Sequence, residues 1–451
     1  MLTYQQIRAK GHFSLDGGSL IPSSDVQIEI EQLGSGSTFL YYQEDQELGL
    51  LPLIVGTGGK AFFIGMTDDG FPIRTSNLRG YLGPIGDRSC FSLAHATCGD
   101  STSAYTSVEL ALTNVIFDQD KHQRCSFAVQ VDDSPLVIEL VPRDDYEKLI
   151  FHMHRTNDPT VTATLRIPLD SVPLDFLDTL SNDFCAALSM VLGRKIQWIH
   201  RTAYSAPNKP VWSEMGETKT KNPTHRQLCF NPDTGAGIHL SIHDVVSIFP
   251  RVREFRQGYD AVHRILYSWL DARLQADFLE ARTLKYAVVL EGLCHLVESQ
   301  HDDIPSTRVP KSEWRATGKE FLPRIKSHLE GLHRINAEAA KDVCNSANWG
   351  NLNRAGFRTI LAACLQKLGI SMLDGAKRIR RFTDVRNKIV HSFRYLTTDD
   401  FNELNWPAIT ETQQHFLVAC FVDEVMLRLF GLGERIPDSL IDSFKAHSAG
   451  N

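Results

Sequence analysis

The spacing of hydrophobic residues changes once along this chain of 451 residues, near residue 172. Before that point hydrophobic and polar residues alternate, as in residues 26–30, 126–131 and 160–167, and residues 136–140 form a short apolar run. Alternation with a period of two is typical of strands that bury one face. Turn residues between these segments predict hairpin tips at 17–18, 34–37 and 68–70. The pattern predicts a mainly antiparallel β domain, sandwich or barrel-like.

Beyond residue 172 the period lengthens to that of an α-helix. Residues 173–192 place Phe176, Leu180, Phe184 and Leu188 on one stripe, and Gly193 suits the end of that helix. A strand is predicted at 195–204, followed by an extended loop over 205–237 that is rich in Pro, Asn, Lys and Gly. From residue 242 onward we expect only helices, at 266–298 with a break near Asp271, 319–333, 336–346, 353–368, 373–393 and 408–430.

These periods predict an α+β protein of two domains, with residues 1–240 mainly β and residues 241–451 all-α. The charge divides in a similar way, because the first 200 residues carry a net charge of −11 and the remainder +4, within a total of −7. A polyanion would therefore bind the basic second half. No apolar run approaches the roughly 18 residues that cross a bilayer, and the first residues do not resemble a secretory signal. With nine scattered cysteines and no C-x-x-C pair, we expect reduced thiols in a cytoplasmic protein.

A polar motif lies in the predicted helix 373–393, where Arg386 and Asn387 are followed by His391. On a helix Asn387 and His391 lie one turn apart, Arg386 borders their face, and Ile389 and Val390 are expected to face the core. RNA cleavage without a metal requires removal of the 2′-OH proton, protonation of the 5′-oxygen and stabilisation of the phosphorane. Histidine, with a pKa of about 6.5, suits the proton transfers. Arginine suits the phosphorane oxygens and Asn387 a positioning role, so the motif predicts a ribonuclease site.

A basic run precedes the motif, since six of the twelve residues from 377 to 388 are basic and only Asp384 is acidic. Such a run is often only a solvated helix face. Beside a site that cleaves phosphodiesters, we predict that it binds the RNA backbone. The four residues assigned to this role are Lys377, Arg378, Arg380 and Arg381. Their spacing prevents all four from facing one cleft, so some must be solvated or paired with acids.

Glu291 and His295, four residues apart on a predicted helix, allow two interpretations. They can form an auxiliary pair, in which case Glu291 and Lys388 support the catalytic residues. Alternatively, Glu291 is a structural residue that forms a salt bridge with an arginine.

Three other patterns suggest ligands but lack the partners that a site would need. His152 and His154 have the spacing of metal ligands on a strand, but no second pair matches them. The same objection applies to a zinc set of Cys90, His95 and Cys98. Residues 56–60 resemble a phosphate loop but lack its upstream glycine and following helix, so a hairpin turn is predicted. We therefore predict no metal and no cofactor.

In this helical setting Arg386, Asn387 and His391 resemble the signature of the HEPN ribonuclease superfamily, in which Arg and a polar residue precede His. Residues 282–293 resemble the first long helix of such a domain, with Glu291 facing inward. The helical resemblance covers about residues 250–435. A mainly β domain followed by this helical domain is similar to the ApeA-like family of bacterial abortive-infection proteins, although for the β domain the similarity rests on order and length.

The resemblance implies an antiphage effector that cleaves RNA, with tRNA as one candidate substrate, as a metal-independent endoribonuclease. HEPN domains commonly pair, so a homodimer or higher homo-oligomer would bring two copies of His391 to one cleft. The β domain would sense a phage-derived trigger, restrain the nuclease, or do both. The alternative is a non-catalytic HEPN module, in which Arg386 and His391 hold a nucleotide or contact a partner protein.

Overall fold

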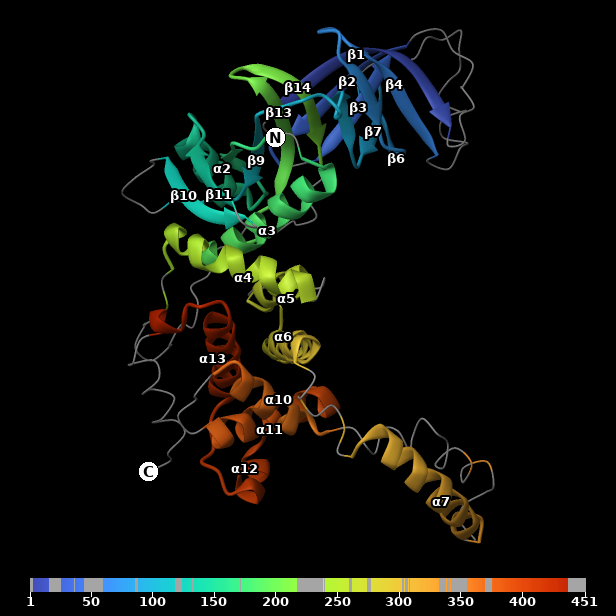
Figure 1. Ribbon diagram of the computed structural model, residues 1–451, viewed down its shortest axis with the longest axis vertical. Coiled ribbons are helices and arrows are strands. Elements are labelled where there is room, and N and C mark those ends of the chain that lie inside the picture. Colours follow the sequence, from blue (N-terminus) through green and yellow to red (C-terminus); the bar gives the residue numbers. More distant parts are fainter. Residues whose placement is uncertain are drawn as a thin grey trace. The chain divides into compact units, whose positions relative to one another are not determined.

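The computed structural model divides the chain into two compact units, which are residues 1–228 with 239–254 and residues 229–238 with 255–451. It describes residues 3–15, 26–35, 37–43, 60–85, 88–117, 124–131, 134–170, 172–216, 238, 240–258, 262–273, 277–301, 304, 307, 309–331, 338, 341, 355–369 and 375–436. An N-terminal antiparallel β region is followed by a C-terminal helical region, which confirms the predicted α+β layout (Figure 1). Three predicted segments, at 17–18, 56–59 and most of 336–346, lie outside the described residues.

The described strands of the first unit form one antiparallel sheet in the order β10-β11-β12-β9-β13-β14-β8-β5-β4-β1-β2-β3-β7-β6. Their bounds are β1 (Thr3–Leu15), β2 (Val26–Leu33), β3 (Thr38–Gln43), β4 (Ala61–Thr67), β5 (Pro72–Thr75), β6 (Leu78–Ile85), β7 (Arg88–Leu93), β8 (Ala96–Gly99), β9 (Ser107–Thr113), β10 (Cys125–Val131), β11 (Ser134–Pro142), β12 (Val161–Ile167), β13 (Trp198–Ala206) and β14 (Lys209–Met215).

This sheet curls back on itself between β13 and β2. A flat sheet would hold these two strands about 29 Å apart, since six strand spacings separate them. Instead the Gln32 side chain at the end of β2 donates hydrogen bonds to the carbonyls of Ile199 and Gly216, at 2.6 and 3.1 Å. The backbone amide of Val161 also donates to the carbonyl of Gly34, at 3.0 Å. The enclosed core contains Phe13, whose ring lies 5.6 Å from that of Phe63.

The alternating segments fold as predicted, because each buries every second residue. Strands β2, β10, β11 and β12 contain the four predicted strands, and the alternation in β10 buries Phe127, Val129 and Val131. The tips at 34–37 and 68–70 join paired strands. Gly70 has a φ of 81°, which favours glycine over residues that carry a Cβ.

Two helices pack within the β unit, and one of them corrects a prediction. Helix α3 (Leu174–Leu192) follows Pro173 and ends at Gly193 in a left-handed conformation, as predicted. Helix α2 (Tyr146–Thr156) lies where the alternating pattern suggested strands. It forms because Tyr146, Leu149 and Met153 bury one helical face. The loop predicted over 205–237 was also wrong at its start, since Lys209–Met215 pairs as β14 with β13 and β8.

The predicted boundary at residue 240 falls short of the one observed, because the first unit retains residues 239–254. This segment contains η1 (Ile242–Asp244) and most of α4 (Val245–Gly258). The ring of Phe249 on α4 lies 5.5 Å from that of Phe184 on α3. Arg253 forms an ion pair with buried Asp183 at 3.6 Å. These contacts attach the first turns of the helical sequence to the β unit.

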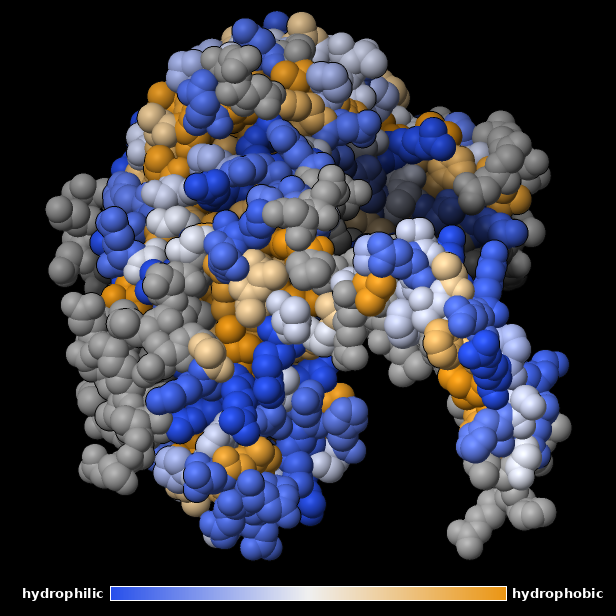
Figure 2. All heavy atoms as spheres, turned by 60° about the horizontal axis from the view of Figure 1, so that its bottom comes forward, coloured by the Kyte–Doolittle hydropathy of each residue, from blue (hydrophilic) through white to orange (hydrophobic). Residues whose placement is uncertain are grey.

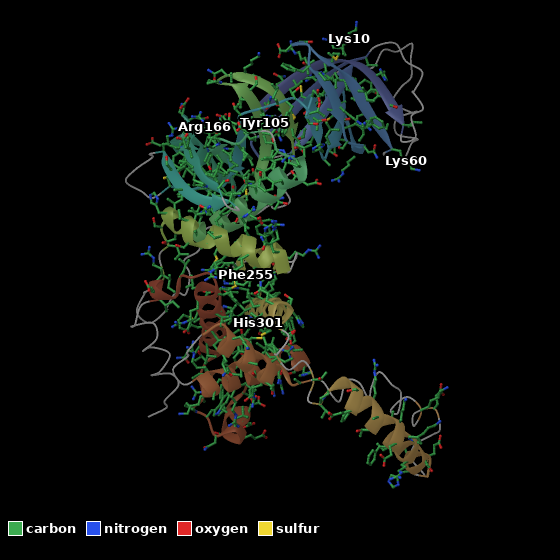
Figure 3. All side chains as sticks on the ribbon, viewed as in Figure 1. Lys10, Lys60, Tyr105, Arg166, Phe255 and His301 are labelled. Carbon is green, nitrogen blue, oxygen red and sulfur yellow. The ribbon has the colours of Figure 1, made fainter. Side chains whose placement is uncertain are left out.

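The second unit consists of helices around a core that includes Phe382 and Phe421, whose rings stack at 5.1 Å. Near the end of α4, the ring of Phe255, labelled in Figure 3, packs edge-on against that of Phe430, with ring centroids 5.5 Å apart. None of the described helices has the length and apolar content needed to cross a membrane. The bounds are α5 (Val262–Ala272), α6 (Leu279–Gln300), α7 (Lys311–Glu330), α10 (Phe357–Lys367), α11 (Gly375–Ser392), α12 (Thr398–Leu404), α13 (Glu411–Leu429) and η2 (Gly433–Arg435).

Candidate functional site

The motif residues lie on α11, which packs antiparallel to α6. Helix α11 buries Ile379, Phe382, Val385 and Ile389, which recur at helical spacing. At one end of the helix pair, Glu291 of α6 forms an ion pair with Arg386. At the other end, the Thr283 hydroxyl of α6 lies 2.6 Å from the hydroxyl of Tyr395, three residues after α11. The hydrophobic stripe therefore determines which side chains of α11 remain accessible.

Arg386 is held by three contacts and remains partly exposed. Its guanidinium pairs with Glu291, donates to Asn387 Oδ1 at 3.0 Å, and lies over the Phe357 ring at 5.6 Å. The side chain is 20% exposed. Its Nε has no hydrogen-bond partner among the described residues. A phosphate oxygen would therefore have to approach the exposed part of the guanidinium, because Nε itself is buried.

His391 differs from Arg386 because it is exposed and has no hydrogen bond or ion pair among the described residues. Asn387, which is half-buried, lies one turn before His391 on the same face. Its Oδ1 is occupied by Arg386, which leaves the Nδ2 hydrogens as available donors. His391 follows Arg386 by five positions, which is about 7.5 Å along the helix axis. They are also about 140° apart around the axis, so Arg386 borders the face that carries Asn387 and His391.

Exposed hydrophobic side chains border this polar group. Val390 is 41% exposed, which corrects the expectation that it faces the core with Ile389. Val390 lies about 80° around the helix axis from Phe382 and about 100° from Ile389, at the edge of the buried stripe rather than within it. Phe393 is 58% exposed, with a φ of 52°, and Val288 on α6 is 56% exposed. Since α6 and α11 run antiparallel, Val288 and Val390 lie at a similar level of the helix pair.

The four residues of the basic run do not share one surface. Arg378 is buried and pairs with Glu424 at 2.7 Å. Arg381 is also buried, with its guanidinium over the Trp406 ring at 5.4 Å. Lys377 is exposed, and Arg380, whose side chain is 53% exposed, lies 3.8 Å from Asp384. Only Lys377 and Arg380 are placed for contact with a polyanion.

Lys388 links α11 to the start of α12. Its Nζ donates to Asp400 at 2.6 Å, and Asp400 also accepts from Thr397 in the capping box that begins α12. The hydrogen bond from Lys388, followed by those from Thr397, lowers the pKa of Asp400 to about 2. Lys388 therefore holds α12 in the described structure, whereas it was predicted as an auxiliary residue of the site.

The residues considered as metal ligands or as an auxiliary pair do not form sites. His295 is exposed and pairs with Glu298 at 2.9 Å, whereas Glu291 pairs with Arg386. The strand assumed for His152 and His154 is wrong, since both lie on α2, where residues two apart point to different sides. In the described part of the chain, no cluster of three or more His, Cys, Asp or Glu residues could hold a metal ion.

The space-filling view shows a mainly hydrophilic face with scattered hydrophobic side chains (Figure 2). The first unit contains a cavity of about 720 Å³, which opens beside β1, β9, β13 and β14. This cavity could not be predicted from the sequence, because its lining residues come from segments that are distant in the chain, from Tyr4 to Ser213.

No family model, curated protein or solved structure matches the chain. What the chain does must therefore be argued from its side chains. The helical unit offers a fixed guanidinium beside an accessible imidazole. The β unit offers a polar cavity that is open on one side.

Proposed function

We propose that the helical unit is a metal-independent endoribonuclease whose site contains Arg386, Asn387 and His391. The proposal rests mainly on one observation, the position of an accessible imidazole on the same helix as a partly exposed guanidinium that is held in place by Glu291 and Asn387. Its resemblance to HEPN nucleases extends this to an ApeA-like antiphage effector, with RNA, including tRNA, as substrate and no cofactor. In this role the β unit controls the nuclease in response to a phage-derived trigger.

The reaction uses two proton transfers and one charge-stabilising group. His391 takes the proton from the ribose 2′-OH, the 2′-oxygen bonds to phosphorus, and the bond from phosphorus to the 5′-oxygen breaks. A second imidazole gives a proton to the departing 5′-oxygen. Arg386 donates hydrogen bonds to the phosphorane oxygens, where negative charge builds up, and Asn387 positions the phosphate. The products carry a 2′,3′-cyclic phosphate and a 5′-hydroxyl.

A homodimer supplies the second imidazole, because the described site contains His391 as its sole histidine. The exposed side chains of Val288, Val390 and Phe393 offer apolar surface beside the site that a second copy can cover. Two copies of His391 then serve as base and acid. Lys377 and Arg380 extend the site toward the RNA backbone.

The ion pair between Glu291 and Arg386 also fits a second candidate function. A carboxylate beside the guanidinium offsets part of the charge that a phosphorane requires. In a non-catalytic module, Arg386 and His391 would hold a nucleotide phosphate or contact a partner without cleaving RNA. The two functions differ in whether His391 takes part in cleaving the bond between phosphorus and the 5′-oxygen of RNA.

An RNA-cleavage assay in the presence of a metal chelator separates these functions. The full chain is compared with His391→Ala and with His328→Ala, which removes an exposed histidine from the last turn of α7. The nuclease proposal predicts a loss of about a hundredfold or more for His391→Ala and none for His328→Ala. Equal cleavage by all three proteins, or RNA binding without cleavage under any condition, would favour the non-catalytic function.

A further inference from the structure

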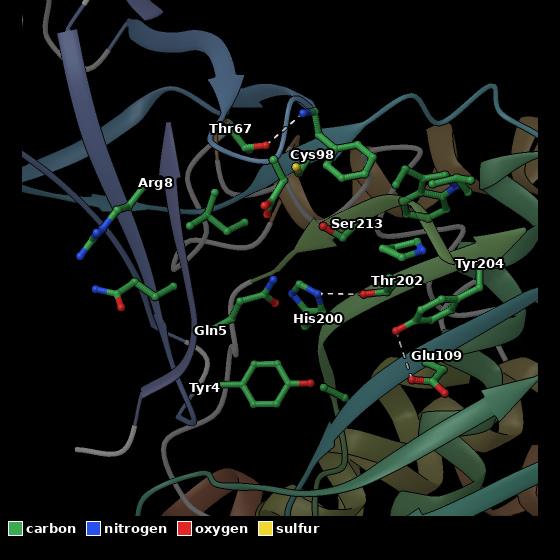
Figure 4. A pocket seen from close by; sticks show the side chains of 18 of the residues that line it. Tyr4, Gln5, Arg8, Thr67, Cys98, Glu109, His200, Thr202, Tyr204 and Ser213 are labelled. Atoms are coloured by element: carbon green, nitrogen blue, oxygen red, sulfur yellow. Dashed lines mark hydrogen bonds between the residues drawn. The ribbon is translucent and has the colours of Figure 1, made fainter. Parts of the chain in front are cut away.

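The cavity of the β unit lies on the face of the sheet opposite α3. On β13, Arg201 points toward α3, where it forms an ion pair with Asp178 at 2.5 Å. Successive residues of a strand point to opposite faces, so His200, Thr202 and Tyr204 point the other way, into the cavity. Tyr4 of β1 faces them across the opening, with its ring centroid 5.7 Å from that of His200 (Figure 4). The curl of the sheet brings these segments together.

A chain of hydrogen bonds fixes the protonation pattern at the cavity wall. The Gln32 side-chain nitrogen donates to two backbone carbonyls, so its Oε1 is the group that faces His200 Nδ1, at 3.2 Å. Because Oε1 can only accept, Nδ1 carries the proton and His200 Nε2 is an acceptor. Thr202 then donates its hydroxyl hydrogen to Nε2 at 3.0 Å. Thr202 Oγ1 also lies beside the Tyr204 hydroxyl, which donates to Glu109, so Oγ1 keeps a lone pair for a hydrogen-bond donor in the cavity.

The His200 and Tyr4 side chains in the cavity wall are uncharged near neutral pH. Burial lowers the pKa of His200 to about 4, so the imidazole is neutral near neutral pH. Burial also raises the pKa of Tyr4 to about 12, so its hydroxyl stays protonated. Among the described residues no hydrogen-bond partner occupies the Tyr4 hydroxyl, which points toward the strands across the cavity (Figure 4). Ser213 and Thr164 add further neutral hydroxyls.

The charged residues around the cavity have partners or offset one another. Glu109, which accepts from the Tyr204 hydroxyl at 3.4 Å, pairs with Arg166 at 2.7 Å (Arg166 in Figure 3). Arg143 pairs with Asp145 at 3.1 Å and stacks over Tyr4. The exposed border carries Arg8 together with the acids Asp68 and Asp69. This arrangement provides no concentrated positive charge for an anionic ligand.

We propose that this cavity binds an uncharged ring compound that presents hydrogen-bond donors, such as a ribonucleoside or a disaccharide. Thr202 accepts a hydrogen bond from the ligand, the Tyr4 hydroxyl makes a second one, and the aromatic rings of Tyr4 and Tyr204 contact the flat face of the ring. A volume of about 720 Å³ suits a molecule of this size. The site is independent of the proposed nuclease, because every lining residue belongs to the first unit.

The proposal is tested by calorimetric titration of the full chain with the four ribonucleosides, their 5′-monophosphates, and the disaccharides maltose and trehalose. Each compound is tried up to about 10 mM, which covers weak binding. The variant Thr202→Val removes the acceptor, and Tyr4→Phe tests the second hydrogen bond if the first variant folds poorly. Thr97→Val is the matched control, because Thr97 is on β8 next to Cys98 and points to the other face of the sheet.

We expect a ribonucleoside or a disaccharide to bind. Thr202→Val should reduce the affinity about tenfold and Tyr4→Phe a few-fold, whereas Thr97→Val should leave it unchanged. Binding of a ribonucleoside or of a disaccharide identifies which source provides the ligand. Tighter binding of the monophosphates than of the nucleosides would overturn the proposal. So would binding that neither Thr202→Val nor Tyr4→Phe weakens, or no binding by any uncharged compound.

Discussion

Two histidines of this chain, His391 and His200, show how position alone changes the role of an imidazole. His391 is exposed at the end of α11 and has no partner among the described residues. His200 is 5% exposed, bonded at both ring nitrogens, and neutral because burial lowers its pKa to about 4. The first can exchange protons with a substrate, whereas the second can only hold a fixed hydrogen-bonding pattern. Chemistry is therefore expected in the helical unit and recognition in the β unit.

The largest expected effect concerns the group beside His391. Arg386→Lys keeps the positive charge but loses the planar forked donor, so cleavage should fall about a hundredfold. The measurement is the rate of RNA cleavage at saturating RNA. Arg324→Lys on α7, where the side chain is 72% exposed, is the control and should leave the rate unchanged. If Arg386→Lys cleaves as fast as the wild type, Arg386 does not stabilise the phosphorane.

Arg378 tests the division between structural and RNA-binding members of the basic run. Arg378→Ala removes one partner of a buried ion pair with Glu424, so the free energy of unfolding of the second unit should fall by roughly 3 kcal/mol. Denaturant titration measures this change. Lys377→Ala, next to it but exposed, should change the unfolding free energy by less than about 0.5 kcal/mol. Equal effects of the two substitutions would contradict the assignment of Arg378 to the core.

His200 should make the β unit sensitive to acid. Its pKa is about 4 when folded, against about 6.5 in the unfolded chain, so protons bind the unfolded state more readily. Its contribution is fully present above about pH 6.5 and is lost as the pH falls toward 4, about 3 kcal/mol in all.

The measurement for His200 is the free energy of unfolding of the β unit as a function of pH, compared with His200→Gln, which cannot titrate in this range. The variant should be less stable at neutral pH and show a flatter pH profile between about 6.5 and 4. His415, whose pKa burial lowers to about 3, provides an internal reference in the second unit, since it remains in both proteins. An unchanged profile would mean that His200 is not neutral in the folded state.

The smallest effects are expected for the exposed cations. Lys377→Ala and Arg380→Ala should weaken RNA binding modestly and lower the slope of log affinity against log salt by about one each. Fluorescence anisotropy with a labelled RNA at several salt concentrations gives the slopes. Lys319→Ala on α7, also exposed, is the control. Unchanged slopes would place the RNA elsewhere.

Local patterns predicted the elements whose burial follows a simple period. The α3 helix, the strands β2, β10, β11 and β12, and α11 with its motif could all be predicted, because apolar spacing and caps are local. Helix α2 was missed since its flanking segments alternate, although the spacing of Tyr146, Leu149 and Met153 carried the signal. Strand β14 was missed because Pro210 and its polar neighbours resemble a loop, and pairing with β13 overrides that preference.

Features that depend on distant residues could not be predicted. Whether Glu291 meets Arg386, 95 positions away, depends on how α6 and α11 align. Burial of Arg378, next to exposed Lys377, depends on the position of Glu424 on α13. The cavity needs the curl of the sheet, which Gln32 fixes by bonds to residues near position 200. Single-sequence patterns hold no record of such contacts.

The central claim, that His391 and Arg386 cleave RNA without a metal, is tested most directly by the ends of the RNA products. Full-length protein is incubated with a defined RNA in excess chelator, and the products are analysed by mass spectrometry. The account predicts fragments with 2′,3′-cyclic phosphate and 5′-hydroxyl ends, which His391→Ala does not produce. Intact RNA, fragments with 5′-phosphate ends, or the same products from His391→Ala would contradict it.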